Sequence, residues 1–147
     1  MLLSKEVAVE LNLIGYKLKH FIAVMLKRHN IPLTPEQFLL TDLLWNQGPM
    51  SQQQLADEMK KDKNSVTKLI DALECKGFVK RIQNNNDRRS NTIVLTEAAE
   101  SLKCDAKQKG ISILDEMLSD ISQEELSAFL ATLKRLDRNM EIVESQL

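Results

Sequence analysis

The sequence predicts a mainly α-helical protein that carries one small β-hairpin. Three observations predict it: punctuated helix starts, a β-branched segment that directly follows an asparagine-rich turn, and long apolar stripes in the helical segments at both chain ends. The 147 residues are 43% apolar and 28% charged, which is ordinary for a globular protein of one domain. We therefore expect residues 1–147 to form a single domain.

Three helices are expected to begin at a hydroxyl residue that is followed three positions later by Gln or Glu. These pairs are Thr34 with Gln37, Ser51 with Gln54, and Ser122 with Glu125. In such a capping box the hydroxyl accepts a hydrogen bond from the third residue's amide, and the Gln or Glu side chain reaches back. Gly48-Pro49 is expected to end the first of these helices before the next capping box opens.

Two further helix starts are expected at Asp62 and Thr96. The Asp62 carboxylate can cap the amides of Asn64 and Ser65, and Gly77 then ends that helix. The helix from Asp62 buries one face, made of Val66, Leu69, Ile70 and Leu73, and its opposite face presents Asn64, Thr67, Lys68 and Asp71, with Ser65 at the edge. Short polar side chains followed by one lysine suit base edges and phosphates in a major groove.

The hairpin is expected from the run Gly77–Arg81, a turn at Gln83–Asn86 and a strand within Asp87–Thr96. It carries Arg88 and Arg89 at its tip. An arginine on a projecting hairpin beside a helix-turn-helix is typical of a wing that reaches into a DNA groove.

Positive charge is concentrated in the middle of the chain. Residues 59–89 hold nine basic and four acidic residues, a local balance of +5 in a chain of net charge −1. Such a block directs a protein's attraction for phosphate to one surface. The alternative interpretation is a lysine-rich helix face exposed to solvent.

Apolar stripes run along both ends of the chain. In the C-terminal segment, apolar residues recur at alternating spacings of three and four residues: Leu126, Phe129, Leu133, Leu136, Met140, Val143 and Leu147. The first helix carries a similar stripe: Val7, Leu11, Ile14, Leu18, Phe21 and Met25. Narrow stripes on long helices favour packing against other helices, so we expect a homodimer built from both termini. The alternative is that each stripe packs on the chain's own core.

The sequence gives little support for an enzyme, a metal or cofactor site, or a membrane protein. His20 and His29 have no Cys or carboxylate at metal-ligand spacing, and four glycines form no phosphate loop, so we expect no enzyme, no metal site and no cofactor. The longest apolar run of the first helix, residues 21–26, is too short to span a bilayer, and we expect a cytoplasmic protein. Cys75 and Cys104 are interpreted as reduced thiols that act as small core hydrophobes.

The segment Asn64–Glu74, the exit Lys76-Gly77-Phe78-Val79 and the wing signature Asp87, Arg89, Leu95 and Thr96 resemble the MarR family of bacterial transcriptional regulators. The resemblance covers nearly the whole chain. It implies a winged helix-turn-helix at residues 34–95, dimerisation helices at 1–30 and 122–147, and a connecting helix at 96–120. A dimer of this kind would bind double-stranded DNA at a palindromic operator.

The resemblance also implies roles for single residues. Arg89 would enter the minor groove while Asp87 holds it, and Arg88 would contact phosphate; the alternative is that Asp87 and Arg88 form a turn-stabilising ion pair. The expected DNA contacts are Gln52, Gln53, Lys63, Asn64, Ser65, Thr67, Lys68, Asp87, Arg88 and Arg89. The expected dimer contacts are Leu11, Leu18, Phe129, Leu133, Leu136 and Met140.

Members of this family usually respond to a small-molecule effector or to oxidation of a cysteine. The first helix contains no cysteine. The aromatic residues nearest an expected ligand crevice are Tyr16, Phe21, Phe38 and Trp45, for which ordinary core packing is the simpler explanation. A rival hypothesis keeps the fold but makes the winged helix a protein-interaction module without operator DNA.

Overall fold

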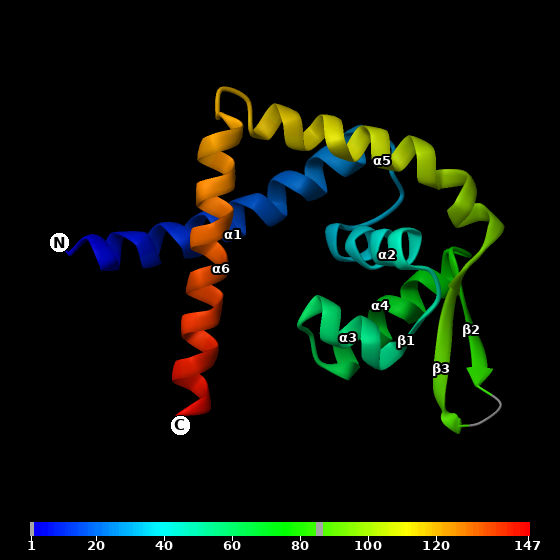
Figure 1. The fold of residues 1–147 in the computed structure, drawn as a ribbon. Coiled ribbons are helices and arrows are strands. Elements are labelled where there is room, and N and C mark those ends of the chain that lie inside the picture. Colours follow the sequence, from blue (N-terminus) through cyan, green and yellow to red (C-terminus); the bar gives the residue numbers. More distant parts are fainter. Residues whose placement is uncertain (1, 85–86) are drawn as a thin grey trace. The chain divides into compact units, whose positions relative to one another are not determined.

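A computed structural model describes residues 2–84 and 87–147; for residues 84 and 87–90 it describes the backbone alone. In chain order the elements of the described part are α1 (Leu3–Arg28), α2 (Pro35–Gln47), β1 (Met50–Ser51), α3 (Gln52–Met59), α4 (Lys63–Cys75), β2 (Val79–Asn84), β3 (Asp87–Leu95), α5 (Glu97–Met117) and α6 (Gln123–Ser145) (Figure 1). The prediction of a mainly helical chain with one small hairpin is confirmed. The chain divides into two compact units, Met1–Ile113 and Leu114–Leu147.

All three predicted capping boxes are present. Thr34 Oγ1 accepts a hydrogen bond from the Gln37 amide at 3.2 Å, and Gln37 Oε1 accepts one from the Thr34 amide at 3.1 Å. Ser51 with Gln54 and Ser122 with Glu125 form the same reciprocal pairs at the starts of α3 and α6. Each pair satisfies two amides that a helix terminus leaves without an intrahelical partner.

The cap of α3 provides a stability test. We expect Ser51→Ala to lower the free energy of unfolding by about 1 kcal/mol, because the Gln54 amide loses its acceptor at 3.0 Å. Ser101→Ala, an exposed serine inside α5, is the matched control and should change stability by less than about 0.5 kcal/mol. Urea denaturation monitored by circular dichroism measures both variants, and equal stabilities would contradict a contribution from the cap.

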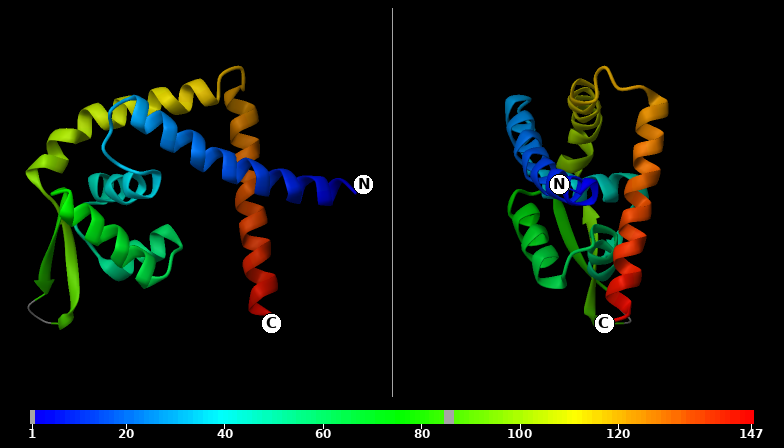
Figure 2. Two further views of the ribbon diagram at one scale, coloured as in Figure 1. Left: turned by 180° about the vertical axis from the view of Figure 1, so that it is seen from behind. Right: turned by 90° about the vertical axis from the view of Figure 1, so that its left-hand side faces the viewer.

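The sheet contains one strand that the sequence did not predict. The strand order is β1-β3-β2, and the two residues of β1 pair antiparallel with β3, Met50 with Ile93 and Ser51 with Thr92. β2 pairs antiparallel with β3 from Val79–Leu95 onward, with an irregularity between Gln83 and Asn84. Both views of Figure 2 show the β2–β3 hairpin extending past α3 and α4.

The core of the first unit lies between α2, α3, α4 and the sheet. Its fully buried large side chains are Leu40, Leu55, Val66, Ile70, Leu73, Val79 and Ile93. Trp45 joins α2 to α5, since its indole Nε1 donates to the Ala99 carbonyl at 3.1 Å, and its ring lies edge-on to Phe38 at 6.0 Å between centroids. The burial of Val66, Ile70 and Leu73 confirms the predicted buried face of α4, and the opposite face of the helix therefore points outward.

The apolar stripes of α1 and α6 remain exposed in the single chain. On α1, Leu18 is exposed and Leu11 is half-buried; only Met25 and Leu26, near the helix end, are buried. On α6, Phe129 is 56% and Met140 58% exposed, Leu133 and Leu136 are half-buried, and no residue of the helix is buried. Most residues of each stripe are therefore exposed or half-buried.

Candidate nucleic-acid interface

The outward face of α4 presents the predicted DNA-contacting residues together. Lys63, Asn64 and Lys68 are exposed, whereas Ser65 and Thr67 are half-buried at the edge of the same face. Buried Val66, Ile70 and Leu73 fix the rotation of the helix, because their side chains occupy the core on the opposite side. The face therefore combines short hydrogen-bonding groups with positive charge.

Asp62 stands at the N-cap of α4 as predicted, but its carboxylate makes a different bond. It accepts a hydrogen bond from the Ser65 hydroxyl at 2.5 Å, and no side-chain hydrogen bond caps the helix amides. That hydrogen bond lowers the pKa of the Asp62 carboxyl. The amides of Ser65 and Asn64 also lower this pKa, which agrees in part with the expected capping, but neither amide forms a hydrogen bond of capping geometry, and the main partner of the carboxylate is the Ser65 hydroxyl.

Gln52 and Thr67 are brought into contact across the helix-turn-helix. The Gln52 side-chain amide donates to Thr67 Oγ1, and that hydroxyl donates to the Lys63 carbonyl at 2.8 Å. Gln53 instead lies on the exposed side of α3, where its amide donates to Asp57 at 2.9 Å. Gln52 thus links the start of α3 to the middle of α4, a role beyond the backbone contact that the sequence predicted.

Some cations of the basic block bind partners within the chain. Lys61, in the turn before α4, pairs with Glu36 at 3.2 Å, and Lys19 of α1 pairs with the same carboxylate at 3.0 Å. These two hydrogen bonds, from Lys19 first and Lys61 second, lower the pKa of Glu36. Lys76 donates to the Pro32 carbonyl and to Gln37.

The positive surface offered to a ligand is therefore smaller than the count of basic residues indicates. Arg81 is engaged as well, by the carboxylates of Asp71 and Glu74. Charges paired within the chain attract phosphate less, because each carboxylate offsets the field of its cation. Lys63 and Lys68 are the exposed cations of α4.

The wing residues Asp87, Arg88 and Arg89 have side chains outside the described residues. Their backbone belongs to β3, and Asp87 stands opposite Asn84 at the end of the strand pairing. The predicted hairpin is confirmed, while the roles of these three side chains stay predictions.

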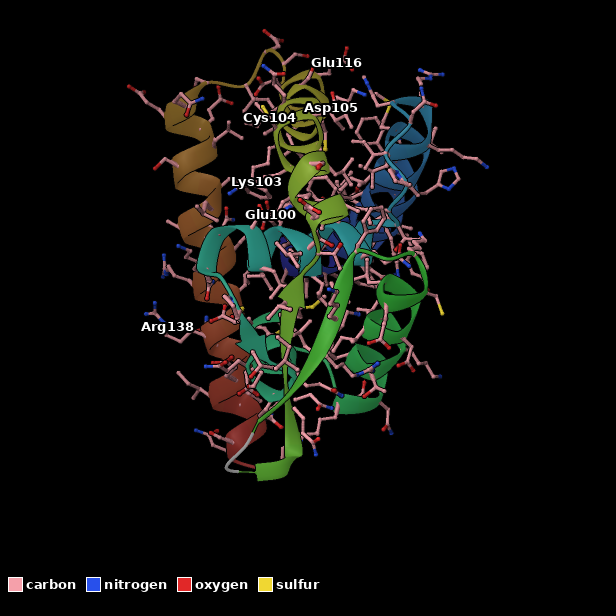
Figure 3. All side chains as sticks on the ribbon, turned by 90° about the vertical axis from the view of Figure 1, so that its right-hand side faces the viewer. Glu100, Lys103, Cys104, Asp105, Glu116 and Arg138 are labelled. Carbon is pink, nitrogen blue, oxygen red and sulfur yellow. The ribbon has the colours of Figure 1, made fainter. Side chains whose placement is uncertain are left out.

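Both cysteines are exposed, so their interpretation as core hydrophobes is wrong. Cys104 lies on α5 beside Lys103 and Asp105 (Figure 3). The buried residues of α5 recur at seven-residue spacing as Ala99, Ala106 and Ile113, and this stripe excludes position 104. Tyr16 also departs from expectation, because it is 78% exposed on α1 and core packing does not explain it.

The described residues contain neither a cluster of metal-ligating side chains nor a helix that could span a membrane. Across residues 2–84 and 87–147, no group of three or more His, Cys, Asp or Glu side chains is arranged to hold a metal ion. Within the same ranges, no helix has the length and apolar character needed to cross a membrane.

A capped helix-turn-helix followed by a hairpin defines a winged helix-turn-helix protein. A family model described as the MarR family matches residues 33–91. The HTH-type transcriptional regulator MhqR of Bacillus subtilis (strain 168) is 32% identical over 111 residues, which cover 76% of this chain and 77% of the relative. The regulator YfiV of the same strain is 33% identical over 111 residues, with coverages of 76% and 69%.

Solved structures share the fold. A MarR transcriptional regulator from Methanosarcina mazei Go1 aligns with a TM-score of 0.78 at 19% identity, covering 94% of this chain and 99% of the other. Reduced AbfR bound to DNA aligns with a TM-score of 0.76 at 20% identity, covering 96% and 94%. The chain belongs to the MarR family of transcriptional regulators, which confirms the resemblance. Because the family and these relatives are regulators, the expectation that the chain is not an enzyme is also confirmed.

Proposed function

We propose that this chain acts in the cytoplasm as a homodimeric transcriptional regulator that binds a palindromic DNA operator. Each protomer inserts α4 into a major groove and directs the β2–β3 hairpin toward the neighbouring minor groove. The twofold axis of the dimer then relates half-sites about one helical turn apart, roughly 10 base pairs from centre to centre.

The outward face of α4 is the observation that supports DNA binding most strongly. It presents two hydroxyls, one amide and two lysines on a helix whose other side is locked into the core. Hydroxyl and amide side chains can bind base edges, and lysines neutralise phosphates. The structural neighbour AbfR is bound to DNA in its solved structure, which agrees with this use of the fold.

The exposed stripes of α1 and α6 support the dimer. Apolar side chains at helical spacing that stay exposed in one chain gain free energy when a second helix covers them, about 25 cal/mol per Å². A second copy of the chain supplies matching stripes, and palindromic operators require twofold symmetry. We therefore assign Leu11, Leu18, Phe129, Leu133, Leu136 and Met140 to the dimer interface.

A small-molecule effector is part of the proposal. A hollow of about 260 Å³ lies where the end of α1 meets the loop before α2, lined in part by Ile31, Leu33, Lys27 and Lys76. Its size is just below the usual range of ligand pockets, about 300–1,000 Å³, so only a small compound would fit. Lys27 favours an anionic compound, whereas the Lys76 ammonium already binds the Pro32 carbonyl and Gln37.

Selection of bound fragments from random duplex DNA tests the proposed function. We expect an enriched sequence with twofold symmetry, bound with an affinity that falls steeply as salt rises, at a slope of roughly −0.9 per neutralised phosphate. Absence of binding, or salt-insensitive binding, would refute the regulator and favour the protein-interaction module. Repeating the selection with small phenolic and anionic compounds tests for an effector, and unchanged affinity with all of them would count against it.

A further inference from the structure

Arg81 occupies a position of β2 that faces the interior. Alternate residues of a strand share a face, and Val79, two residues earlier, is buried. The cross-strand partner of Arg81 is Ile93, which is fully buried. By contrast, the neighbours Lys80 and Ile82 are exposed on the other face. The Arg81 side chain retains only 21% exposure, so its charge is directed along α4 rather than into open solvent.

The guanidinium of Arg81 joins two carboxylates of α4. Its Nη2 donates to Asp71 Oδ1 at 2.6 Å, and its Nη1 donates to Glu74 Oε1 at 2.9 Å. Asp71 and Glu74 are three residues apart and therefore share a helix face. One planar donor group thus holds the base of the hairpin against the C-terminal half of α4 through two charge-assisted hydrogen bonds.

The turn between α4 and β2 is closed by local hydrogen bonds, from the Gly77 amide to the Glu74 carbonyl at 3.0 Å and from the Phe78 amide to the Leu73 carbonyl at 2.9 Å. Gly77 joins the two elements with a φ of +82°, a conformation that glycine adopts without steric cost. Thr96 braces this turn from the start of α5, since its hydroxyl donates to the Gly77 carbonyl at 2.6 Å. Arg81 adds a second brace further along the strand, on the side of the hairpin that faces α4.

We propose that Arg81 is a positioning residue that sets the angle between α4 and the hairpin for DNA recognition. The inference rests on the proposed function, in which helix and hairpin occupy neighbouring grooves of one duplex. Their relative angle must match the groove spacing before binding, because a mobile hairpin would lose conformational entropy when the complex forms. Arg81 acts through Asp71 and Glu74 and does not itself contact the DNA.

A direct phosphate contact by Arg81 makes opposite predictions. If Arg81 bound phosphate, removal of Asp71 and Glu74 would free the guanidinium and reduce repulsion, and affinity would rise. If Arg81 positions the hairpin, removal of the carboxylates weakens binding even though the protein becomes more positive. The sign of this effect separates the two roles.

The experiment measures binding of the full-length protein to the duplex that wild type selects from random DNA. We expect the Asp71→Ala/Glu74→Ala variant to bind about tenfold more weakly than wild type, a free-energy loss of ~1.4 kcal/mol. Arg81→Ala should bind about tenfold more weakly too, with a salt slope equal to that of wild type, since loss of a phosphate contact would reduce the slope by roughly 0.9. Combining all three substitutions should cost no more than Arg81→Ala alone.

The charge-matched control is Glu100→Ala/Glu116→Ala, which removes two carboxylates from α5. Figure 3 shows both residues, and we expect this variant to bind DNA as tightly as wild type. Thermal unfolding of each variant establishes that it is folded at the assay temperature. Because Asp71 and Glu74 are exposed, we expect their replacement by alanine to leave the fold intact. Unchanged or tighter binding by that variant, or a reduced salt slope for Arg81→Ala, would overturn the positioning role alone. A wild-type protein that binds no duplex would refute the proposed function as well.

Discussion

Leu133→Glu should convert the proposed dimer to a monomer and abolish tight operator binding. The carboxylate would enter the apolar seam of α6, where burying an unpaired charge costs several kcal/mol. Two linked half-site contacts bind about 10²–10⁴-fold more tightly than one, so a monomer should lose affinity for the palindrome by that factor. Sedimentation equilibrium measures the mass, and fluorescence anisotropy with the selected duplex measures the affinity.

Ala131→Glu provides the matched control for this prediction. It adds the same carboxylate to α6 at an exposed position two residues from Leu133, on a different side of the helix. We expect it to remain dimeric and to bind DNA like wild type. A monomeric Leu133→Glu variant that still binds the full palindrome tightly would separate assembly from DNA binding and contradict the proposed dimer.

The helix starts could be predicted from the sequence because each depends on a few adjacent residues. Thr34, Ser51 and Ser122 form capping boxes with partners three positions away, and the bonds in the structure are those that the pattern predicts. The strand β1 could not be predicted, since a strand of two residues shows no alternation of apolar and polar residues. The existence of β1 depends on pairing with Ile93 and Thr92, more than forty residues along the chain.

The helical periodicity of the sequence could have corrected the prediction that the cysteines lie in the core. Cysteine is often buried, and that general tendency favoured the core. Position 75, however, lies two residues past Leu73, the last buried residue of α4, and about 200° around the helix from it. The periodicity of the helix outweighs the tendency of the residue type, and both thiols are exposed.

Side-chain partners across elements were beyond the reach of sequence patterns. The block of basic residues was counted as one positive surface, yet Lys61 pairs with Glu36 of α2, and Arg81 pairs with Asp71 and Glu74. Only the packing of α2 and β2 beside α4 decides which cations are neutralised. Strand alternation from Val79 does place Arg81 on the inner face, and this is the signal that distinguishes it from exposed Lys80.

Arg89→Ala should weaken operator binding by ~1–3 kcal/mol, about 5- to 150-fold, if Arg89 reads the minor groove. Narrow A/T-rich minor grooves concentrate negative potential, which favours an inserted guanidinium. Exchanging A/T for G/C base pairs in the operator flanks should therefore weaken wild type but leave the Arg89→Ala variant nearly unaffected. Competition binding with the two duplexes measures this coupling.

Arg88→Ala is the neighbouring control for Arg89→Ala, because Arg88 is expected to contact phosphate without reading sequence. It should weaken binding to both duplexes alike and reduce the salt slope by roughly 0.9. An Arg89→Ala variant that binds like wild type, or that loses affinity equally on both flanks, would show that the hairpin does not read the minor groove through this residue. Sequence preference would then have to come from the outward face of α4, whose short polar side chains and lysines are both able to hydrogen-bond to base edges.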